Sequence, residues 1–440
     1  MDSILDIHSA IKVAEKKANI IIKDSLESNY GLDINPDDKA KWSNSLFYMD
    51  NLTAIKELIA SGYSGTFDLL YLDPPFFTNL ILNKNITIDT PEGNIKFKLP
   101  LYSDNWDNNL YEYLEMLTTR LILMRELLSE SGTIYVHIDW RVVHYIRLIM
   151  DYVFGKERFL NEIIWAYKSG GAGRRSFSKK HDNILVYTKS KNYIFNISKE
   201  KSYNRGLKPY RFKNVLEYKD ERGWYTLVNS KDVWNIDMVG RTSSERVDYA
   251  TQKPYKLLEK IILTSSNKGS LIGDFFAGSG TSLIVAEKLQ RRWVGSDNSI
   301  HSIVQVKKRL EPVGAEYNIF SSKEEKDKNG LKGIKIYNTD SFVEIDLSDI
   351  ECDLENIIDI NQKTNTDKIK YLKENAYLLL DYISICSGLE GDQIVAEVFR
   401  QDIKSKIKIP FSNNSLNDIC VKSIDIWGKE YSNNYFESKI

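Results

Sequence analysis

A carboxylate followed by two prolines and two aromatic rings is the first group of residues whose types could support chemistry. Asp73-Pro74-Pro75-Phe76-Phe77 follows the mostly apolar run Asp68–Leu72, which is typical of a buried parallel strand. The strand must end at the prolines, because neither has an N–H to donate to a neighbouring strand. The Asp73 carboxylate and the proline carbonyls would then lie at the carboxyl end of a strand, where open α/β sheets bind ligands. The alternative is a simple turn that closes a core strand.

A glycine turn much later in the chain is the second such group. Asp274-Phe275-Phe276-Ala277-Gly278-Ser279-Gly280 includes the end of another apolar run, and Asp297 ends the next predicted strand. Glycines here let the backbone approach a nucleotide-like ligand closely, and the later acid suits a ribose diol. A dinucleotide such as NAD is the alternative ligand, but the turn lacks the third glycine of that fingerprint.

A lysine stands just before the helix that leads to the strand of this glycine turn. Thr251-Gln252-Lys253-Pro254 precedes a helix predicted at 256–264. A helix N-terminus attracts anions, so a lysine placed there beside a glycine loop can pair with a ligand carboxylate. The alternative is a surface cap without a ligand.

A basic segment lies between the two groups. From Lys168 to Arg222 there are 15 Lys and Arg against 5 Asp and Glu, in a chain whose net charge is −1. Such a segregated excess indicates a footprint for a polyanion, although a solvated basic loop is the alternative. Five cations lie on a Gly-rich loop that suits phosphate contacts: Lys168, Arg174, Arg175, Lys179 and Lys180. Aromatic residues that interleave with cations further on form either a base-reading surface or a small core: Tyr203, Tyr210, Phe212 and Tyr218.

The elements that must position these residues alternate between strand and helix. Strands are predicted at 46–49, 68–72, 133–139, 271–276 and 292–297, with helices at 3–24, 51–59, 110–128, 141–154 and 281–289. This alternation predicts an α/β fold with a mostly parallel sheet. A strand pair at 161–167 and 183–187 adds an antiparallel edge. We predict a loop at 78–110, helices at 368–384 and 392–400, and a strand at 419–427.

The bulk composition excludes several classes of protein. No stretch approaches the ~18–20 apolar residues of a membrane span, and the N-terminus Met1–Asp6 carries acids where a secretion signal carries lysines. Cys352, Cys386 and Cys420 are too far apart for a disulfide framework or a zinc site, so we expect no metal and a reducing cytoplasm.

In their order along the chain, these motifs resemble the S-adenosylmethionine-dependent DNA amino-methyltransferases of the beta class. In that family an Asp/Ser/Asn-Pro-Pro-Tyr/Phe motif precedes a target-recognition segment, and a Phe-x-Gly-x-Gly motif comes near the C-terminal end. The resemblance covers roughly residues 44–310 and implies a Rossmann-like methyltransferase fold with a circularly permuted sheet. It departs at Phe77, where the family commonly has asparagine. The implied divisions are 1–43 (helical), 44–190 (catalytic half), 191–248 (target recognition), 249–310 (cofactor-binding half) and 311–440 (an α+β extension of unknown role).

The resemblance also implies roles for individual residues. Asp73 and the Pro74 carbonyl, fixed by Pro75, would accept hydrogen bonds from an exocyclic base amine, and Phe76 would stack on the base. Residues that would line the methionine and ribose side of the cofactor are Asp274, Phe276, Gly278 and Gly280. Asp297 would bind the ribose hydroxyls, Lys253 the carboxylate and Asp50 the adenine end.

We therefore predict methylation of adenine N6 in double-stranded DNA, because the family's motif begins with Asp for adenine and with Ser for cytosine N4. Cytosine N4 stays an alternative, since both amines offer an N–H to the same acceptors. Methylation at cytosine C5 is excluded, because no cysteine follows a proline. The motifs are also compatible with an RNA or protein methyltransferase, an inactive DNA-binding relic or, least of all, an NAD-dependent oxidoreductase. A homodimer and a cognate restriction endonuclease are further predicted partners.

Overall fold

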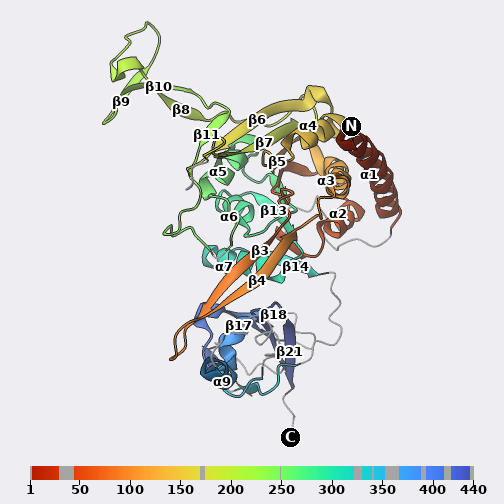
Figure 1. Ribbon diagram of the computed structural model, residues 1–440, viewed down its shortest axis with the longest axis vertical. Coiled ribbons are helices and arrows are strands. Elements are labelled where there is room, and N and C mark those ends of the chain that lie inside the picture. The colour runs from red at the N-terminus through yellow and green to blue at the C-terminus, as the bar shows by residue number, and fades with distance from the viewer. Residues whose placement is uncertain are drawn as a thin grey trace. The chain divides into compact units, whose positions relative to one another are not determined.

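The computed structural model describes residues 2–28, 44–168, 174–247, 249–321, 330–338, 341–351, 366–387, 393–410 and 418–436. They divide into two compact units (Figure 1). The first contains Met1–Leu80 and Ser103–Ser322, and the second contains Ile81–Tyr102 and Lys323–Ile440. Each unit is described by itself.

A nine-stranded sheet forms the centre of the first unit, in the order β11-β6-β7-β5-β2-β12-β13-β1-β14. All neighbouring strands are parallel except where β7 pairs with β5 and β6. The strands are β1 (Asn44–Tyr48), β2 (Phe67–Leu72), β5 (Leu128–Ile138), β6 (Phe159–Ala166), β7 (His181–Thr188), β11 (Val233–Asn235), β12 (Leu271–Asp274), β13 (Arg292–Asp297) and β14 (Tyr317–Ser321). The predicted mostly parallel α/β fold is confirmed, but the antiparallel strand lies inside the sheet and not at its edge.

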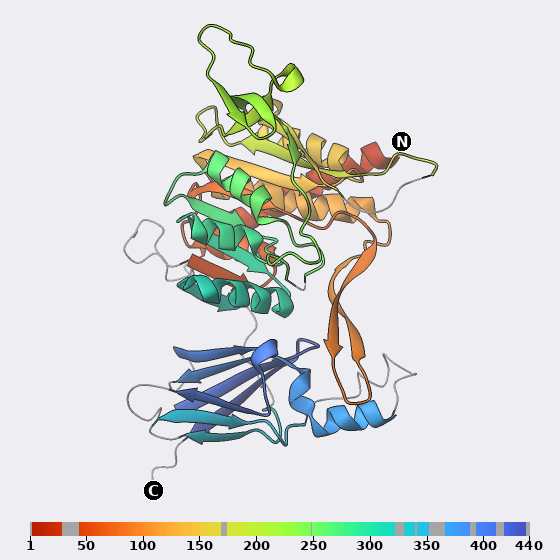
Figure 2. The ribbon, with the colours of Figure 1, turned by 90° about the vertical axis from the view of Figure 1, so that its left-hand side faces the viewer.

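Helices cover both faces of this sheet (Figure 2). Side chains of β2 alternate between two cores, with Leu70 and Leu72 in one and Leu69 and Tyr71 in the other. The first core receives α1 (Asp2–Glu27), α2 (Asn51–Ala60), α3 (Leu110–Leu127) and α4 (Val143–Phe154). The second receives α5 (Tyr255–Ser265), α6 (Thr281–Lys288) and α7 (Ile300–Leu310). Because β2 is apolar on both faces, it must be a central strand, as the run Asp68–Leu72 predicts.

A small three-stranded sheet belongs to the same unit and projects from it in Figure 1. Its strands β8 (Lys199–Tyr203), β10 (Gly223–Asn229) and β9 (Glu217–Asp220) pair antiparallel. It lies within the segment that the sequence assigns to target recognition.

The second unit has its own core and contains a hairpin from the middle of the first unit's sequence. Strands β3 (Leu80–Ile88) and β4 (Ile95–Asp104) form that hairpin. The remaining strands form two sheets, β15 (Lys335–Asn338) with β16 (Phe342–Asp346) and β19 (Lys406–Pro410), and β18 (Gln393–Phe399) with β17 (Leu380–Ser387), β20 (Asp418–Asp425) and β21 (Glu430–Phe436). The predicted loop at 78–110 is therefore wrong, because Ile86, Ile88 and Phe97 are buried in this core.

One predicted helix of the second unit is too long, and another is wrong. Helix α9 (Thr366–Glu374) ends early, and 380–384 belongs to β17, whose residues 380–386 are all buried. Residues 393–399 form β18 and not a helix. A short apolar run that is buried on both faces has no periodicity that separates strand from helix. The strand predicted at 419–427 is confirmed by β20.

Candidate active site

The Asp73 carboxylate lies where β2 ends, between the carboxyl ends of β5 and β12. Its Oδ2 accepts a hydrogen bond from Nζ of Lys253. Its Oδ1 is buried and has no hydrogen-bond partner among the described residues, and Nδ1 of His137 lies 3.8 Å away. A buried carboxylate oxygen without a donor is costly. The arrangement therefore fits a ligand that brings an N–H or O–H to Asp73.

A buried polar network lies behind Asp73. The His137 side chain is fully buried, with Nδ1 3.0 Å from the Tyr71 hydroxyl and Nε2 3.2 Å from Oδ2 of Asp182. The Tyr167 hydroxyl donates to Oδ1 of Asp182 at 3.0 Å. Burial raises the pKa of Tyr71, so this hydroxyl stays protonated. Burial alone would raise the pKa of Asp182, but the hydrogen bond and charge of His137 lower it. The network thus joins β2, β5 and β7 beneath the predicted catalytic motif.

Asp104 holds the backbone that carries Phe76. This buried carboxylate accepts hydrogen bonds from the N–H groups of Phe76 at 3.2 Å, Phe77 at 3.1 Å and Thr78 at 2.8 Å. The Thr78 hydroxyl donates at 2.6 Å and the Trp106 indole at 2.9 Å. One side chain therefore fixes three successive residues after the prolines.

The loop held by Asp104 has an unusual backbone. Phe77 and Asn79 have positive φ of 59° and 55°, a left-handed region that residues other than glycine adopt at a cost. The Tyr113 hydroxyl donates to the Pro75 carbonyl at 2.8 Å, and its ring packs on Phe77 at 5.4 Å between centroids. Phe77, which departs from the family's asparagine, therefore packs against α3, while the ring of Phe76 lies 5.6 Å from that of His137.

The glycine turn lies beside Asp73, at the carboxyl end of β12. Gly278 has φ +50° and donates its N–H to Oδ2 of Asp297 at 2.9 Å. Gly280 has φ +72°, and a Cβ there would lie 2.7 Å from Val306. Arg309 donates from Nη1 to the Ser279 carbonyl at 2.5 Å and fixes the turn from α7. Gly280 leaves no room for a side chain, and Gly278 has a left-handed backbone that glycine adopts most readily, as a turn that holds a ligand against the backbone requires.

Two acids, Asp274 and Asp297, lie beside the glycine turn. Burial raises the pKa of Asp274 to about 7, although the Ser282 hydroxyl and the Phe276 N–H both donate to its carboxyl group. Burial also raises the pKa of Asp297, which accepts from the N–H groups of Gly278 and Ser299. A bound cation would favour the ionised form of either acid. The turn and these acids therefore fit a ligand with a positively charged group and a diol.

Asp50 lies at the carboxyl end of β1 and is already paired. Its side chain caps α2 by accepting from the Leu52 N–H at 2.8 Å and forms an ion pair with Arg120 at 3.2 Å. Arg120 also donates to the Asn51 side chain, which donates to the Phe275 carbonyl at 2.9 Å. These linked contacts connect α3 to the strand of the glycine turn.

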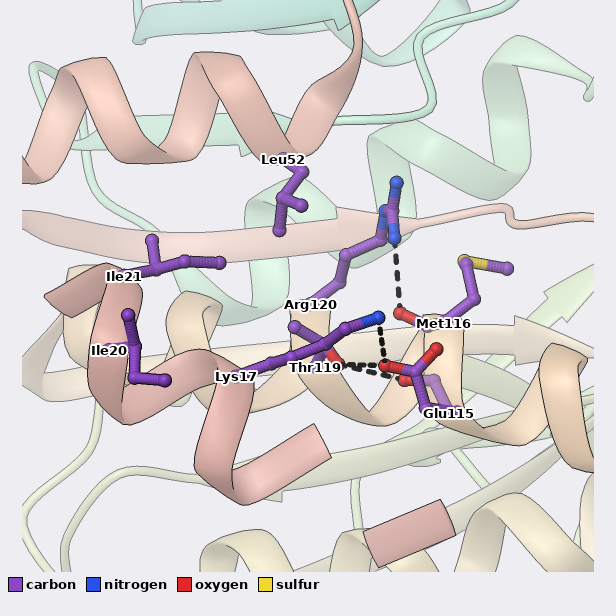
Figure 3. A pocket seen from close by; sticks show the side chains of 8 residues that line it. All are labelled: Lys17, Ile20, Ile21, Leu52, Glu115, Met116, Thr119 and Arg120. Atoms are coloured by element: carbon purple, nitrogen blue, oxygen red, sulfur yellow. Dashed lines mark hydrogen bonds and ion pairs between the residues drawn. The ribbon is translucent and has the colours of Figure 1, made fainter. Parts of the chain in front are cut away.

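A cavity of about 280 Å³ lies beside Arg120, among α1, α2 and α3 (Figure 3). Its polar groups bind one another, with Lys17 2.9 Å from Glu115 and Arg120 donating to the Met116 carbonyl at 3.2 Å. Because these polar groups already have partners within the protein, the cavity offers few hydrogen-bonding groups to a ligand. The Asp73 carboxylate does not line it.

The structure places Lys253 at Asp73, whereas the sequence assigns it to the cofactor carboxylate. It stands just before α5, as predicted, and its Nζ lies 5.4 Å from the centre of the Phe76 ring. The pairing with Asp73 fits a second role, which is to hold one carboxylate oxygen so that the other faces the ligand.

The predicted phosphate-binding cations lie on the connection between β6 and β7, which leaves and rejoins the sheet at the edge that carries Asp73. Lys168, Arg174, Arg175 and Lys179 are exposed, Lys180 is half-buried, and residues 169–173 of the loop lie outside the described part. Nζ of Lys179 lies 4.2 Å from the ring centre of Trp140, an exposed side chain that follows β5. The cations therefore share an edge of the sheet with the Asp73 carboxylate.

Sequence reasoning missed several residues of this site, above all His137, Asp182, Asp104 and Arg309. A histidine inside the apolar run Thr133–Asp139 is a signal that could have been used, because a buried polar side chain needs a partner. Asp104 and Arg309 give no local signal, since their contacts come from residues distant in sequence. Among the described residues, no cluster of His, Cys, Asp or Glu could hold a metal ion, and no helix could span a membrane.

Comparison with known proteins gives concordant matches. The family model of N6/N4 methyltransferases, described as DNA methylase, matches residues 67–308. The type II methyltransferase M.EcaI of Enterobacter cloacae is 29% identical over 66% of this chain and 74% of its own length. The type II methyltransferase M.HpaI of Haemophilus parainfluenzae is 31% identical over 59% and 72%. The crystal structure of the M1.HpyAVI–SAM complex aligns with 60% of this chain and 98% of its own, at 19% identity and a TM-score of 0.38.

Proposed function

The chain belongs to the N6/N4 DNA methylase family, and we propose that it methylates the N6 amine of adenine at a specific site in double-stranded DNA. S-adenosylmethionine is the methyl donor. The observation that carries the proposal is the buried Oδ1 of Asp73, which has no donor among the described residues. An exocyclic amine provides the N–H that this oxygen lacks.

The chemistry requires such an acceptor. The lone pair of an adenine amine is delocalised into the ring, so the nitrogen is a poor nucleophile. A carboxylate oxygen that accepts from its N–H stabilises the positive charge that develops on nitrogen as the N–C bond forms. When bound at the glycine turn, S-adenosylmethionine supplies a methyl group on a positively charged sulfur. Asp73 Oδ1 is also placed to take the proton that the amine loses.

The other residues of the motif position the base. The Pro74 carbonyl, fixed in direction by Pro75, is the proposed second acceptor, and Phe76 stacks on the base ring. The base must leave the duplex, at a cost of a few kcal/mol, and stacking returns ~1–3 kcal/mol. Asp104 and Tyr113 hold this loop in place, so little reorganisation is needed when the base arrives.

We assign the cofactor to the glycine turn and its neighbours. Gly278 and Gly280 give the close backbone approach, Phe276 and Asp274 line the methionine side, and Asp297 accepts from the ribose hydroxyls. Asp274 and Asp297 suit a cationic ligand, because burial raises both pKa values and a positive charge would lower them. Asp50 is proposed at the adenine end, where Arg120 holds its carboxylate.

We propose that the DNA backbone contacts the cations between β6 and β7, namely the exposed Lys168, Arg174, Arg175 and Lys179 and the half-buried Lys180. They share the sheet edge with Asp73, so phosphates bound there would flank the flipped nucleotide. A homodimer, a cognate restriction endonuclease and the beta-class order remain predictions from the resemblance.

Nucleoside analysis tests the choice of base. Plasmid DNA is incubated with the full chain and S-adenosylmethionine labelled in the methyl group, then digested to nucleosides. We expect label in N6-methyladenine. Label only in N4-methylcytosine would contradict the choice of adenine and leave the Asp73 acceptor intact, since both amines present an N–H. Label in added RNA or in protein, with none in DNA, would contradict the substrate.

A further inference from the structure

A loop of the small sheet carries exposed apolar and aromatic side chains. We call residues 204–216, between β8 and β9, the tip loop. Its large apolar residues are Leu207 (43% exposed), Tyr210 (42%), Phe212 (62%), Val215 (44%) and Leu216 (78%). Protein surfaces in contact with water rarely gather this many in so short a segment without a binding partner.

The structure separates this group from the aromatic core of the small sheet. Tyr203 and Tyr218 each pack on Tyr225 with ring centroids 5.6 Å apart, so they stabilise the sheet itself. Tyr210 and Phe212 instead pack on each other at 5.2 Å within the tip loop. Of the two interpretations of these aromatics, the small core therefore applies to Tyr203 and Tyr218. Tyr210 and Phe212 are the pair available to a ligand.

The conformation of the tip loop is fixed by hydrogen bonds. Glu217 accepts from the N–H groups of Tyr210 at 2.7 Å and Arg211 at 2.8 Å, and from the Asn204 side chain at 2.6 Å. Asn204 also donates to the Lys208 carbonyl at 3.0 Å. These contacts hold the apolar residues outward in a defined arrangement, which lowers the entropy cost of binding.

The charge of the tip loop indicates what binds to it. Residues 204–216 contain four cations and no acid, namely Arg205, Lys208, Arg211 and Lys213. The nearest acid, Glu217, is engaged with the loop's own backbone. Apolar side chains flanked by cations match a ligand that offers apolar faces between negative charges. Base-pair steps of duplex DNA have this chemistry, and proteins that kink DNA insert apolar wedges into them.

We propose that the tip loop inserts Phe212 and Leu216 between base pairs away from the target adenine and kinks the duplex. Lys208, Arg211 and Lys213 bind the flanking phosphates. The inference rests on duplex DNA being the substrate, as proposed above. It adds a shape-dependent contribution to site selection, because base steps differ in the cost of being kinked.

A plasmid topology assay tests this without knowledge of the recognition site. Closed circular plasmid is relaxed by a type I topoisomerase in the presence of the full chain, and the linking number is measured after the protein is removed. We expect a shift with the wild-type chain that is lost in the Phe212→Ala, Leu216→Ala double variant. Leu263→Ala, which removes an exposed apolar side chain of α5, is the matched control and should keep the shift.

Binding measurements separate insertion from phosphate contact. Affinity for a short duplex should fall about tenfold in the double variant, as for loss of a stacked base, with an unchanged salt dependence. Replacing Lys208, Arg211 and Lys213 by Ala should lower the log–log salt slope by up to about 0.9 per contact. Circular dichroism and cofactor binding confirm that each variant is folded.

The outcomes distinguish this inference from the proposed function. Methylation of the plasmid without any shift in linking number, or with the same shift in the double variant, overturns the wedge and leaves the methylation proposal standing. A shift that depends on Phe212 and Leu216, without methylation, supports the wedge and contradicts the proposed activity. Binding of the loop to anionic lipid vesicles, with duplex affinity unchanged in the double variant, would overturn the wedge and assign the loop to a membrane surface.

Discussion

Replacing Asp104 by asparagine should slow methyl transfer about a hundredfold while cofactor binding stays near that of the wild type. Asparagine keeps one oxygen for the Phe77 N–H and the Trp106 indole. It places an amide NH₂ where Oδ2 now accepts from the Phe76 N–H, the Thr78 N–H and the Thr78 hydroxyl. The two backbone N–H groups then face another donor, whereas the Thr78 hydroxyl can rotate to accept, and the loop must move.

The magnitude follows from the lost contacts. A hydrogen bond to a carboxylate contributes about 1.5–3 kcal/mol, so losing two costs about 3–6 kcal/mol. Phe77 and Asn79 hold left-handed backbone that relaxes once its anchor is gone. If about 3 kcal/mol of this lost hydrogen-bond energy raises the activation free energy of methyl transfer, the rate falls by about two orders of magnitude, since about 1.36 kcal/mol corresponds to a tenfold change in rate.

Single-turnover methylation at saturating DNA and cofactor measures this rate, and calorimetry measures cofactor binding. Asp107→Asn is the matched control, because Asp107 is an exposed carboxylate three residues after Asp104 that accepts from the Asn105 side chain at 3.0 Å. A folded Asp104→Asn variant with a rate within about threefold of the wild type would refute the claim that Asp104 positions Phe76. Loss of cofactor binding together with activity would show a general structural defect.

Four further predictions concern buried or paired groups. The pKa of Asp274 is raised to about 7, and a cationic cofactor favours the ionised form of this acid. Affinity for S-adenosylmethionine should therefore rise from about pH 6 to about pH 8, and this rise should vanish in the Asp274→Asn variant. A flat pH profile of the wild-type affinity would contradict this prediction. The same raised pKa means that Asp274 contributes less to folding stability as pH increases from about 4 to about 7, because the folded chain then holds a proton that the unfolded chain has lost. If Lys253 orients Asp73, Lys253→Met should lower the methylation rate about tenfold and leave cofactor affinity unchanged. Reduced affinity for S-adenosylmethionine would instead favour a role of Lys253 at the cofactor carboxylate. His137→Ala should lower the free energy of unfolding in urea by about 1–3 kcal/mol, since Asp182 loses a buried partner, and the exposed His144→Ala should not.

The sequence predicts the sheet and its ligand-binding edge because the signals there are local. Asp73-Pro74-Pro75 ends an apolar run, and Gly278 and Gly280 occupy positions with the positive φ that glycine adopts most readily. Each feature is decided by a few adjacent residues. For that reason the order of the motifs along the chain is enough to predict the mostly parallel sheet of the first unit.

Other parts depend on contacts that no local pattern records. The hairpin of β3 and β4 looks polar because one face is exposed, although Ile86 and Ile88 alternate with polar residues as a half-buried strand does. Its apolar face packs in one core with described residues between Leu331 and Tyr431, so the hairpin belongs to a core formed mainly by a distant segment. The partnership of Asp104 with Phe76 and that of Lys253 with Asp73 likewise arise only when the chain folds.

The central claim is that Asp73 accepts the N–H of the target amine, and the methylation rate of its variants tests it most directly. Asp73→Ala removes the acceptor and should lower the single-turnover rate by at least about a thousandfold, with cofactor affinity within about twofold of the wild type. Asp73→Asn keeps one acceptor oxygen and should retain measurable methylation. A wild-type rate in a folded Asp73→Ala variant would contradict the account.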